Sequence, residues 1–213
     1  SRFTADVTAP SFGQTVTLTA SIGYILALNL AVPTGTIKFI DGATLATLSG
    51  GLGHDRVVRA MPNIAAQVGE AMSLWTATPQ VTESQKGMAR SLLSALGKEI
   101  FTAEEKYLDM ATAVSGSGPA YVLLFIEALA DAAVHIGLPR EMATPMVLQT
   151  VLGTARLAQE SGQHPAELRN SVTSPGGTTA EALLRLEEGG FRGLVIRAVQ
   201  AAHQKAQGLG QGK

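Results

Sequence analysis

Apolar and polar residues alternate with two different periods along this chain. In the N-terminal part, the stretch QTVTLTASI (14–22) alternates apolar side chains with threonine, which is typical of a strand with one buried face. The denser apolar run YILALNLAV (24–32) follows it. PTGTIKFIDGATLATL (33–48) then predicts turn, strand, turn and strand, because proline and glycine separate its apolar runs. Residues 1–60 are therefore predicted to be a β-rich segment.

After residue 60 the period changes to that of helices. Thr82 is a candidate N-cap before one apolar-periodic stretch, and Pro119 occupies the first turn of another. The predicted helices span 81–97, 102–115, 118–138, 139–162, 165–172, 178–190 and 191–208. The fold class is thus predicted to be α+β, with a partial sheet followed by an all-α dimerisation bundle of six or seven helices at 61–213.

Two of these helices are apolar around most of their circumference. They lie at residues 120–136 and 143–158. A helix of this kind must be surrounded by other protein, so the pattern predicts at least a homodimer. Glu127 and Asp131 interrupt the longer apolar run, which makes a buried helix a better interpretation than a membrane span.

Composition excludes several classes of partner. The formal net charge is -1, so no basic surplus draws the chain to nucleic acid or to anionic lipid. The chain has no cysteine, its 4 histidines lie far apart, and no secretory signal is evident. We expect a cytoplasmic protein with no metal, no nucleic-acid partner and no membrane partner.

The stretch SVTSPGGTTAEALLRLEEGG (171–190) carries the strongest chemical signal. Two glycines and several hydroxyl residues precede a helix, and such a start can direct backbone N–H groups toward a small anion such as a carboxylate. Ser174 and Thr179 would add hydroxyl donors. The alternative, which spacing alone leaves equally open, is a plain helix start with Thr178 or Thr179 as N-cap.

Three further segments have weaker signals. AVSGSGPAY (113–121) lacks the strand that precedes a nucleotide-binding glycine loop, so a tight helix-to-helix connection capped by Ser117 is favoured. RAMPN (59–63) predicts a strand that ends in a loop, where ligands often bind. Glu127, Asp131 and His135 share a helical face, for which a solvated stripe or subunit contact is favoured over a polar site.

Taken together, these motifs resemble one family. RVVRAMPN, AVSGSGPAYV, EALADAAVHIGLPREMA and SVTSPGGTTAEALLRLEEGGFR match pyrroline-5-carboxylate reductase in order and spacing, over about residues 42–208. The resemblance implies reduction of the cyclic imine 1-pyrroline-5-carboxylate to L-proline, a reaction of proline biosynthesis, with NADPH or NADH. It also implies a homodimer of interleaved helices, and dimers of this family often assemble further.

The resemblance also implies roles for individual residues. Ser174, Gly176, Gly177 and Thr178 match the cradle for the substrate carboxylate. Thr179 matches the catalytic threonine whose hydroxyl faces the ring nitrogen.

Pro62 and Asn63 match the Met-Pro-Asn loop beside the nicotinamide. The family usually continues this loop with threonine or serine and then proline. This chain has Ile64-Ala65 there, which leaves the shape of the loop open.

Upstream of this loop the sequence departs from the family. The family begins with a strand and a glycine-rich dinucleotide loop, whereas Gly13, Gly23, Gly35 and Gly42 are isolated here. Residues 1–50 instead resemble part of a bacterial immunoglobulin-like repeat, although these strands could also replace the end of a Rossmann sheet.

We therefore expect a chimera with a truncated or replaced dinucleotide-binding half, and doubtful turnover. The alternatives are a non-catalytic dimeric helical module and a structural fusion with immunoglobulin-like strands.

Overall fold

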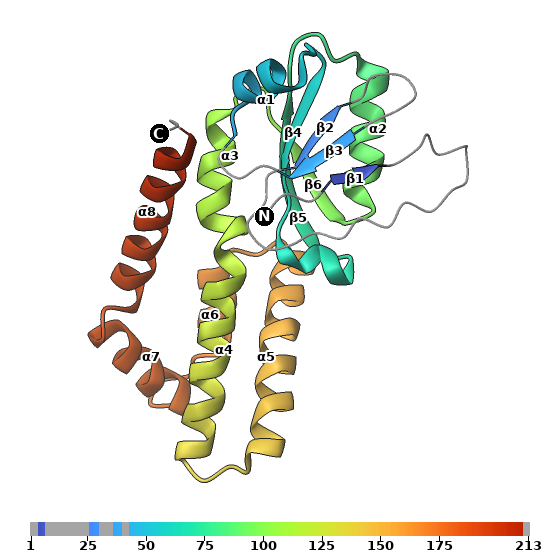
Figure 1. The fold of residues 1–213 in the computed structure, drawn as a ribbon. Coiled ribbons are helices and arrows are strands. Elements are labelled where there is room, and N and C mark those ends of the chain that lie inside the picture. Colours follow the sequence, from blue (N-terminus) through green and yellow to red (C-terminus); the bar gives the residue numbers. More distant parts are fainter. Residues whose placement is uncertain (1–3, 7–25, 30–35, 40–42, 211–213) are drawn as a thin grey trace. The chain divides into compact units, whose positions relative to one another are not determined.

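The computed structural model describes residues 4–6, 26–29, 36–39 and 43–210, and these residues form two compact units. Unit 1 contains the described residues up to Pro119 together with those from Val199 onward. Unit 2 contains residues 120–198. Figure 1 shows the sheet and its covering helices in unit 1 and the long helices of unit 2.

Unit 1 is built on a mixed sheet. Its elements, in chain order, are β1 (Thr4–Asp6), β2 (Leu26–Asn29), β3 (Thr36–Phe39), α1 (Leu45–Leu52), β4 (Val57–Met61), the 3₁₀ helix η1 (Ile64–Val68), β5 (Ala71–Ala77), α2 (Glu83–Ser94), β6 (Gly97–Phe101), α3 (Lys106–Ala111) and the π-helix η2 (Thr112–Gly116). The strand order is β1-β3-β2-β4-β5-β6. Only the pairing of β5 with β6 is parallel among the described strands, and the other four pairings are antiparallel.

Helix α2 covers one face of the sheet (Figure 1). Ala89 and Leu93 of α2 are buried against Val58, Ala60 and Trp75. The helix begins at the predicted N-cap, because Thr82 accepts a hydrogen bond from the Gln85 N–H and the Gln85 side chain accepts one from the Thr82 N–H. The predicted start of this helix is thus confirmed.

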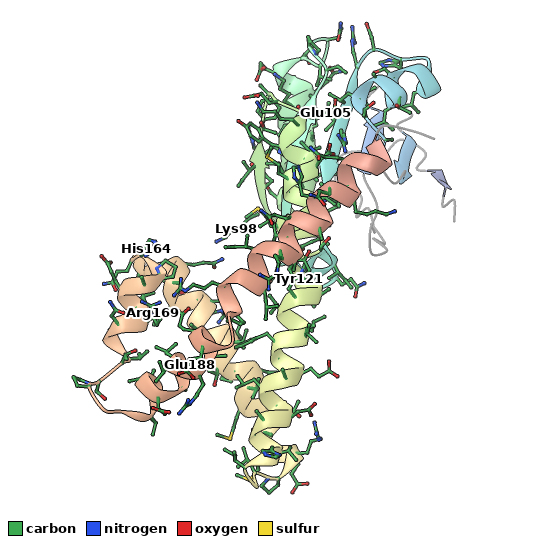
Figure 2. All side chains as sticks on the ribbon, turned by 90° about the vertical axis from the view of Figure 1, so that its left-hand side faces the viewer. Lys98, Glu105, Tyr121, His164, Arg169 and Glu188 are labelled. Carbon is green, nitrogen blue, oxygen red and sulfur yellow. The ribbon has the colours of Figure 1, made fainter. Side chains whose placement is uncertain are left out.

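Helices α1 and α3 contact the opposite face of β4. Leu48 of α1 packs on Val57, and the Arg59 side chain lies beneath α3, where only 3% of it is exposed. Arg59 pairs with Glu105 at 2.7 Å and with Asp109 at 3.1 Å. These ion pairs attach α3 to the central strand of unit 1; Glu105 is labelled in Figure 2.

The structure corrects one predicted strand and adds three, which are β1, β5 and β6. Residues 43–48 were expected to contain a strand, but helix α1 begins at Leu45, because Thr44 caps it by accepting a hydrogen bond from the Thr47 N–H. Strands β5 and β6 lie in the part expected to be purely helical. The predicted division after residue 60 therefore falls inside unit 1, since these strands continue the sheet past it.

The N-terminal strands extend the same sheet. β2 pairs with both β3 and β4, so the described parts of residues 1–42 belong to the sheet of unit 1. The strand predicted at 14–22 lies outside the described residues. The immunoglobulin-like resemblance stays a prediction.

Unit 2 is helical. The helices after the sheet are α4 (Gly118–His135), α5 (Arg140–Ser161), α6 (Pro165–Ser171), α7 (Thr178–Glu188) and α8 (Phe191–Gly210), of which α4 begins and α8 ends in unit 1. With α2 and α3, seven α-helices follow residue 61 in the described part of the chain, as predicted.

Most large apolar side chains of unit 2 are exposed in the single chain. Among residues 120–198, only Ala130, Ala143 and Val147 are buried. The exposed ones on α4 and α8 are Val122, Leu123, Leu124, Phe125, Leu129, Phe191, Leu194, Val195 and Ile196. Helices with so much exposed apolar surface need a further protein surface to cover them.

One helical run in the described residues, Lys106–His135, is long and apolar enough to cross a membrane by length and composition. This property alone is a weak indication of a membrane span, because core helices of globular proteins share it. The run comprises α3, η2 and α4, and it contains Pro119.

Candidate functional site

A tight turn precedes α7. The Gly177 N–H donates to the Ser174 carbonyl at 3.0 Å, and Gly176 has a φ of 68°. A positive φ at the third position is what a type II β-turn requires, and proline is common at its second position. A Cβ at position 177 would lie 3.2 Å from the Ser174 carbonyl oxygen and would overlap its hydroxyl. Gly177 is therefore favoured by close packing against Ser174, and Gly176 by its positive φ.

Helix α7 begins without a side-chain cap. Gly177 is the N-cap in an extended conformation, so neither Thr178 nor Thr179 caps the helix and the plain-cap alternative for them is wrong. In the described part of the chain, no hydrogen bond occupies the hydroxyls of Ser174, Thr178 or Thr179. The first N–H groups of a helix also lack intrahelical partners.

This arrangement is suited to binding an anion. Backbone N–H donors at the positive end of the α7 dipole lie beside three uncommitted hydroxyls. A carboxylate accepts several hydrogen bonds at once and would satisfy these groups together. Ser174, Gly176, Gly177, Thr178 and Thr179 are thus brought together in one short segment of unit 2.

The other predicted loop lies at the end of β4 in unit 1. Pro62 is buried and Asn63 is half-buried. The Asn63 Oδ1 accepts from the Ala65 N–H at 3.2 Å, and its Nδ2 donates to the Ser115 carbonyl at 3.1 Å. The carboxamide keeps one further N–H and one further acceptor position for a ligand.

The departure at Ile64-Ala65 has a visible consequence. Residues 64–68 form η1, and Asn63 is its N-cap through the N–H of Ala65. A proline at position 65, which the family usually has, could not make this bond because it lacks the N–H. In this chain the Asn63 side chain therefore closes the loop onto the Ala65 N–H.

Residues 115–118, with the sequence SGSG, begin at the hydrogen bond between Ser115 and Asn63 of the Met-Pro-Asn loop. Residues 112–116 form a π turn that continues directly into α4, so the predicted connection between two helices is a widened turn within one helical run. A Cβ at Gly116 would lie 2.9 Å from the Met61 methyl group. Gly116 therefore permits the close approach of β4 and η2.

The polar stripe on α4 forms no metal site. Asp131 pairs with Arg140 at 2.7 Å, while Glu127 and His135 are exposed. No group of three or more His, Asp or Glu side chains within residues 43–210 could hold a metal ion.

Sequence reasoning missed the buried cluster of Arg59, Glu105 and Asp109. A signal was present, because an arginine within an apolar strand whose two faces are covered must have charged partners. It also missed the hydrogen bond between Asn63 and Ser115. Pro119 was the available signal there, since a proline deprives the carbonyl four residues earlier of its donor.

Unit 1 contains one Gly-x-Gly triplet before Met61, at Gly51-Leu52-Gly53. It ends α1 and precedes β4, and Gly53 is the C-cap with a φ of 62°. A dinucleotide loop has the reverse order, a strand followed by a helix. This triplet is therefore a helix ending.

Comparisons with known proteins show which family the chain resembles. The family model described as "Pyrroline-5-carboxylate reductase dimerisation" matches residues 105–209. The pyrroline-5-carboxylate reductase of Glycine max is 46% identical over 173 residues, 81% of this chain and 63% of the relative. That of Escherichia coli is 43% identical over 174 residues, 81% of this chain and 64% of the relative.

A solved structure shows the same relationship in three dimensions. The crystal structure of Plasmodium falciparum pyrroline carboxylate reductase with NADP bound superposes with a TM-score of 0.75 and 37% identity. The match covers 79% of this chain and 68% of that one. The helical part of this chain matches the dimerisation domain of that family. The chain belongs to the pyrroline-5-carboxylate reductase family, and it spans 63% to 65% of the length of the first four curated relatives it matches.

Proposed function

We propose that this chain provides the substrate-binding and dimerisation parts of a pyrroline-5-carboxylate reductase. The observation that carries the proposal is the turn Ser174–Gly177, which opens an uncapped helix beside three uncommitted hydroxyls. These groups would hold the carboxylate of 1-pyrroline-5-carboxylate or of L-proline. The Thr179 hydroxyl would face the ring nitrogen, which gains a proton as the imine carbon gains a hydride.

The cofactor side is incomplete in these 213 residues. The relatives' hydride donor would be NADPH or NADH, and Pro62 and Asn63 are the predicted contacts beside the nicotinamide. A dinucleotide also needs a glycine loop between a parallel strand and a helix. Residues 1–60 have no such fingerprint, and the described strands around β4 are antiparallel. We therefore infer that turnover by this polypeptide alone is weak or absent.

This incompleteness supports a second candidate function. A dimeric helical module that keeps the imino-acid cradle without catalysis needs only unit 2 and its partner. The assay that separates the two is NADPH oxidation with 1-pyrroline-5-carboxylate and a control without substrate. Substrate-dependent oxidation above the control would establish the reductase, whereas a folded protein that binds L-proline without oxidising NADPH would establish the module.

Replacing Thr179 by alanine is expected to weaken L-proline binding about five- to ten-fold, the factor for one lost hydrogen bond. Gly177→Ala should weaken it by at least the same factor, because the added methyl displaces Ser174. The measurement is titration calorimetry, with circular dichroism to verify the helices. Thr47→Ala, on the exposed surface of α1, is the matched control. Unchanged affinity in both loop variants would contradict the proposed cradle.

A homodimer is the proposed cover for the apolar helices of unit 2. The match to a dimerisation domain and the exposure of Leu124 (65%) support this. Leu124→Glu should raise the dimer dissociation constant at least a hundred-fold, because a charge would enter an apolar interface. Sedimentation equilibrium measures this constant. The control is Val68→Glu in unit 1, where the side chain is 75% exposed; equal effects of the two changes would contradict the assignment.

The same dimer would account for the apolar run Lys106–His135 without a membrane. The cytoplasmic location also stays a prediction.

A further inference from the structure

Pro119 leaves one carbonyl of a long helix without its usual donor. In an α-helix the Ser115 carbonyl would accept from the N–H of residue 119, but proline has none and its ring crowds that oxygen. The backbone responds by widening into η2, in which the Ser117 N–H donates to the Thr112 carbonyl at 2.7 Å. The Ser115 oxygen is therefore available to a donor from outside the helix.

That donor is the side chain of Asn63. Its Nδ2 lies 3.1 Å from the Ser115 oxygen, and its Oδ1 is occupied by the Ala65 N–H. An N-cap needs only the acceptor oxygen, which serine or aspartate would also supply. The carboxamide provides the acceptor for the loop and the donor for the helix at once, on two different atoms, whereas a carboxylate provides the acceptor alone.

A second proline shows that this pairing is specific. Pro145 lies inside α5 and deprives the Glu141 carbonyl of its donor in the same way. No side chain in the described part of the chain donates to that oxygen, and α5 has no π turn. The π turn and the external donor thus occur together at Pro119 and are both missing at Pro145.

We propose that Asn63 is a positioning residue that holds the Met-Pro-Asn loop on the carbonyl freed by Pro119. The loop and the η2 turn, both in unit 1, then move as one body. The Met61 methyl lies at the same junction, since a Cβ at Gly116 would be 2.9 Å from it. In the proposed function, on which this step rests, the loop borders the nicotinamide. The hydrogen bond from Asn63 to the Ser115 carbonyl, called the lock below, then sets the position of the loop without requiring Asn63 itself to contact the cofactor.

The first test removes the donor and keeps the cap. Asn63→Asp should make the amide protons of Ala66 in the loop and Ser117 in the helix exchange about five- to ten-fold faster, the factor for one hydrogen bond. Residue-resolved hydrogen exchange by NMR measures both. Asn170→Asp, on the exposed face of α6, is the matched control and should change neither rate. Faster exchange at only one of the two amides would overturn the lock.

The second test acts from the helix side. Pro119→Ala restores an N–H that competes for the Ser115 carbonyl, so the Ala66 amide should again exchange about five- to ten-fold faster, although the substitution is remote in sequence. Pro145→Ala is the control and should leave Ala66 unchanged. An unchanged Ala66 rate in Pro119→Ala, or an equal change in Pro145→Ala, would overturn the proposal even if Asn63→Asp fails to fold.

The exchange rates are independent of the proposed enzymatic role. L-proline titration of the unmodified protein tests the proposed function, and the two amides test the lock. If proline does not bind while the amides respond as expected, the proposed function fails and the lock stands. If proline binds while the two amides do not respond, the lock is overturned and the proposed function stands.

Discussion

Replacing Gly97 by alanine is expected to lower the free energy of unfolding by about 3 kcal/mol, from backbone strain and a direct clash together. Gly97 begins β6 with a φ of 144°, a conformation that residues with a Cβ rarely adopt. An added Cβ would overlap the backbone N and O of Ala71 and lie 2.9 Å from its carbonyl carbon. Because these atoms are backbone, no side-chain rotation relieves the clash.

The consequence should be local separation of β6 from β5. Gly97 pairs with Ala71, and the Ala71 N–H donates to the Leu96 carbonyl at 2.8 Å. Urea unfolding followed by the fluorescence of Trp75, the single tryptophan, measures the change. Gly87→Ala is the matched control, because Gly87 lies in α2 with open space around it, and it should stabilise by about 0.5–1 kcal/mol. Equal destabilisation by both changes would contradict the steric argument.

Gly97 also shows why part of the fold escaped prediction. The helix predicted at 81–97 ends at Gly97, a position that glycine often occupies, but α2 ends at Ser94 and Gly97 opens a strand. Local sequence does not distinguish these roles, because the decisive contact is with Ala71, far along the chain. The helix start at Thr82 was predictable, since its capping box lies within four residues.

The same distinction applies to the candidate site. The turn before α7 was predictable because proline, two glycines and the following helix are adjacent in sequence. The junction of Asn63 with Ser115 joins residues 52 positions apart, and the pairing of Arg59 with Glu105 spans 46. Local periodicity cannot report contacts at such separations. The sequence shows that Ile64-Ala65 departs from the family pattern. The effect of this departure on the loop is seen only in the structure, where Asn63 caps η1 through the Ala65 N–H.

Replacing Arg59 by methionine is expected to cost about 3 kcal/mol of stability, because a buried guanidinium that pairs with two half-buried carboxylates is removed. The Arg59 guanidinium donates to Glu105 Oε1 at 2.7 Å and to Asp109 Oδ1 at 3.1 Å. Methionine fills much of the same volume but leaves two carboxylates facing each other without a cation. Glu105 also accepts from the Leu45 N–H at 2.6 Å, so the loss should reach the start of α1.

The matched control is Arg185→Met. Arg185 also pairs with two carboxylates, Glu181 at 2.8 Å and Glu188 at 2.9 Å, but its side chain is 68% exposed. An exposed cluster is screened by water, so this change should cost no more than about 0.5 kcal/mol. Urea unfolding of both variants under one set of conditions gives the comparison.

A triple replacement separates charge from packing. With Arg59→Met, Glu105→Leu and Asp109→Leu together, no unpaired carboxylate remains, and most of the lost stability should return. The Arg59 Nε and the Thr76 hydroxyl, which face each other across β4 and β5, are both buried without a partner. The native cluster therefore already bears an uncompensated polar cost that an apolar cluster would partly remove. If the triple variant is as unstable as Arg59→Met, lost packing rather than unpaired charge explains the effect of the single change.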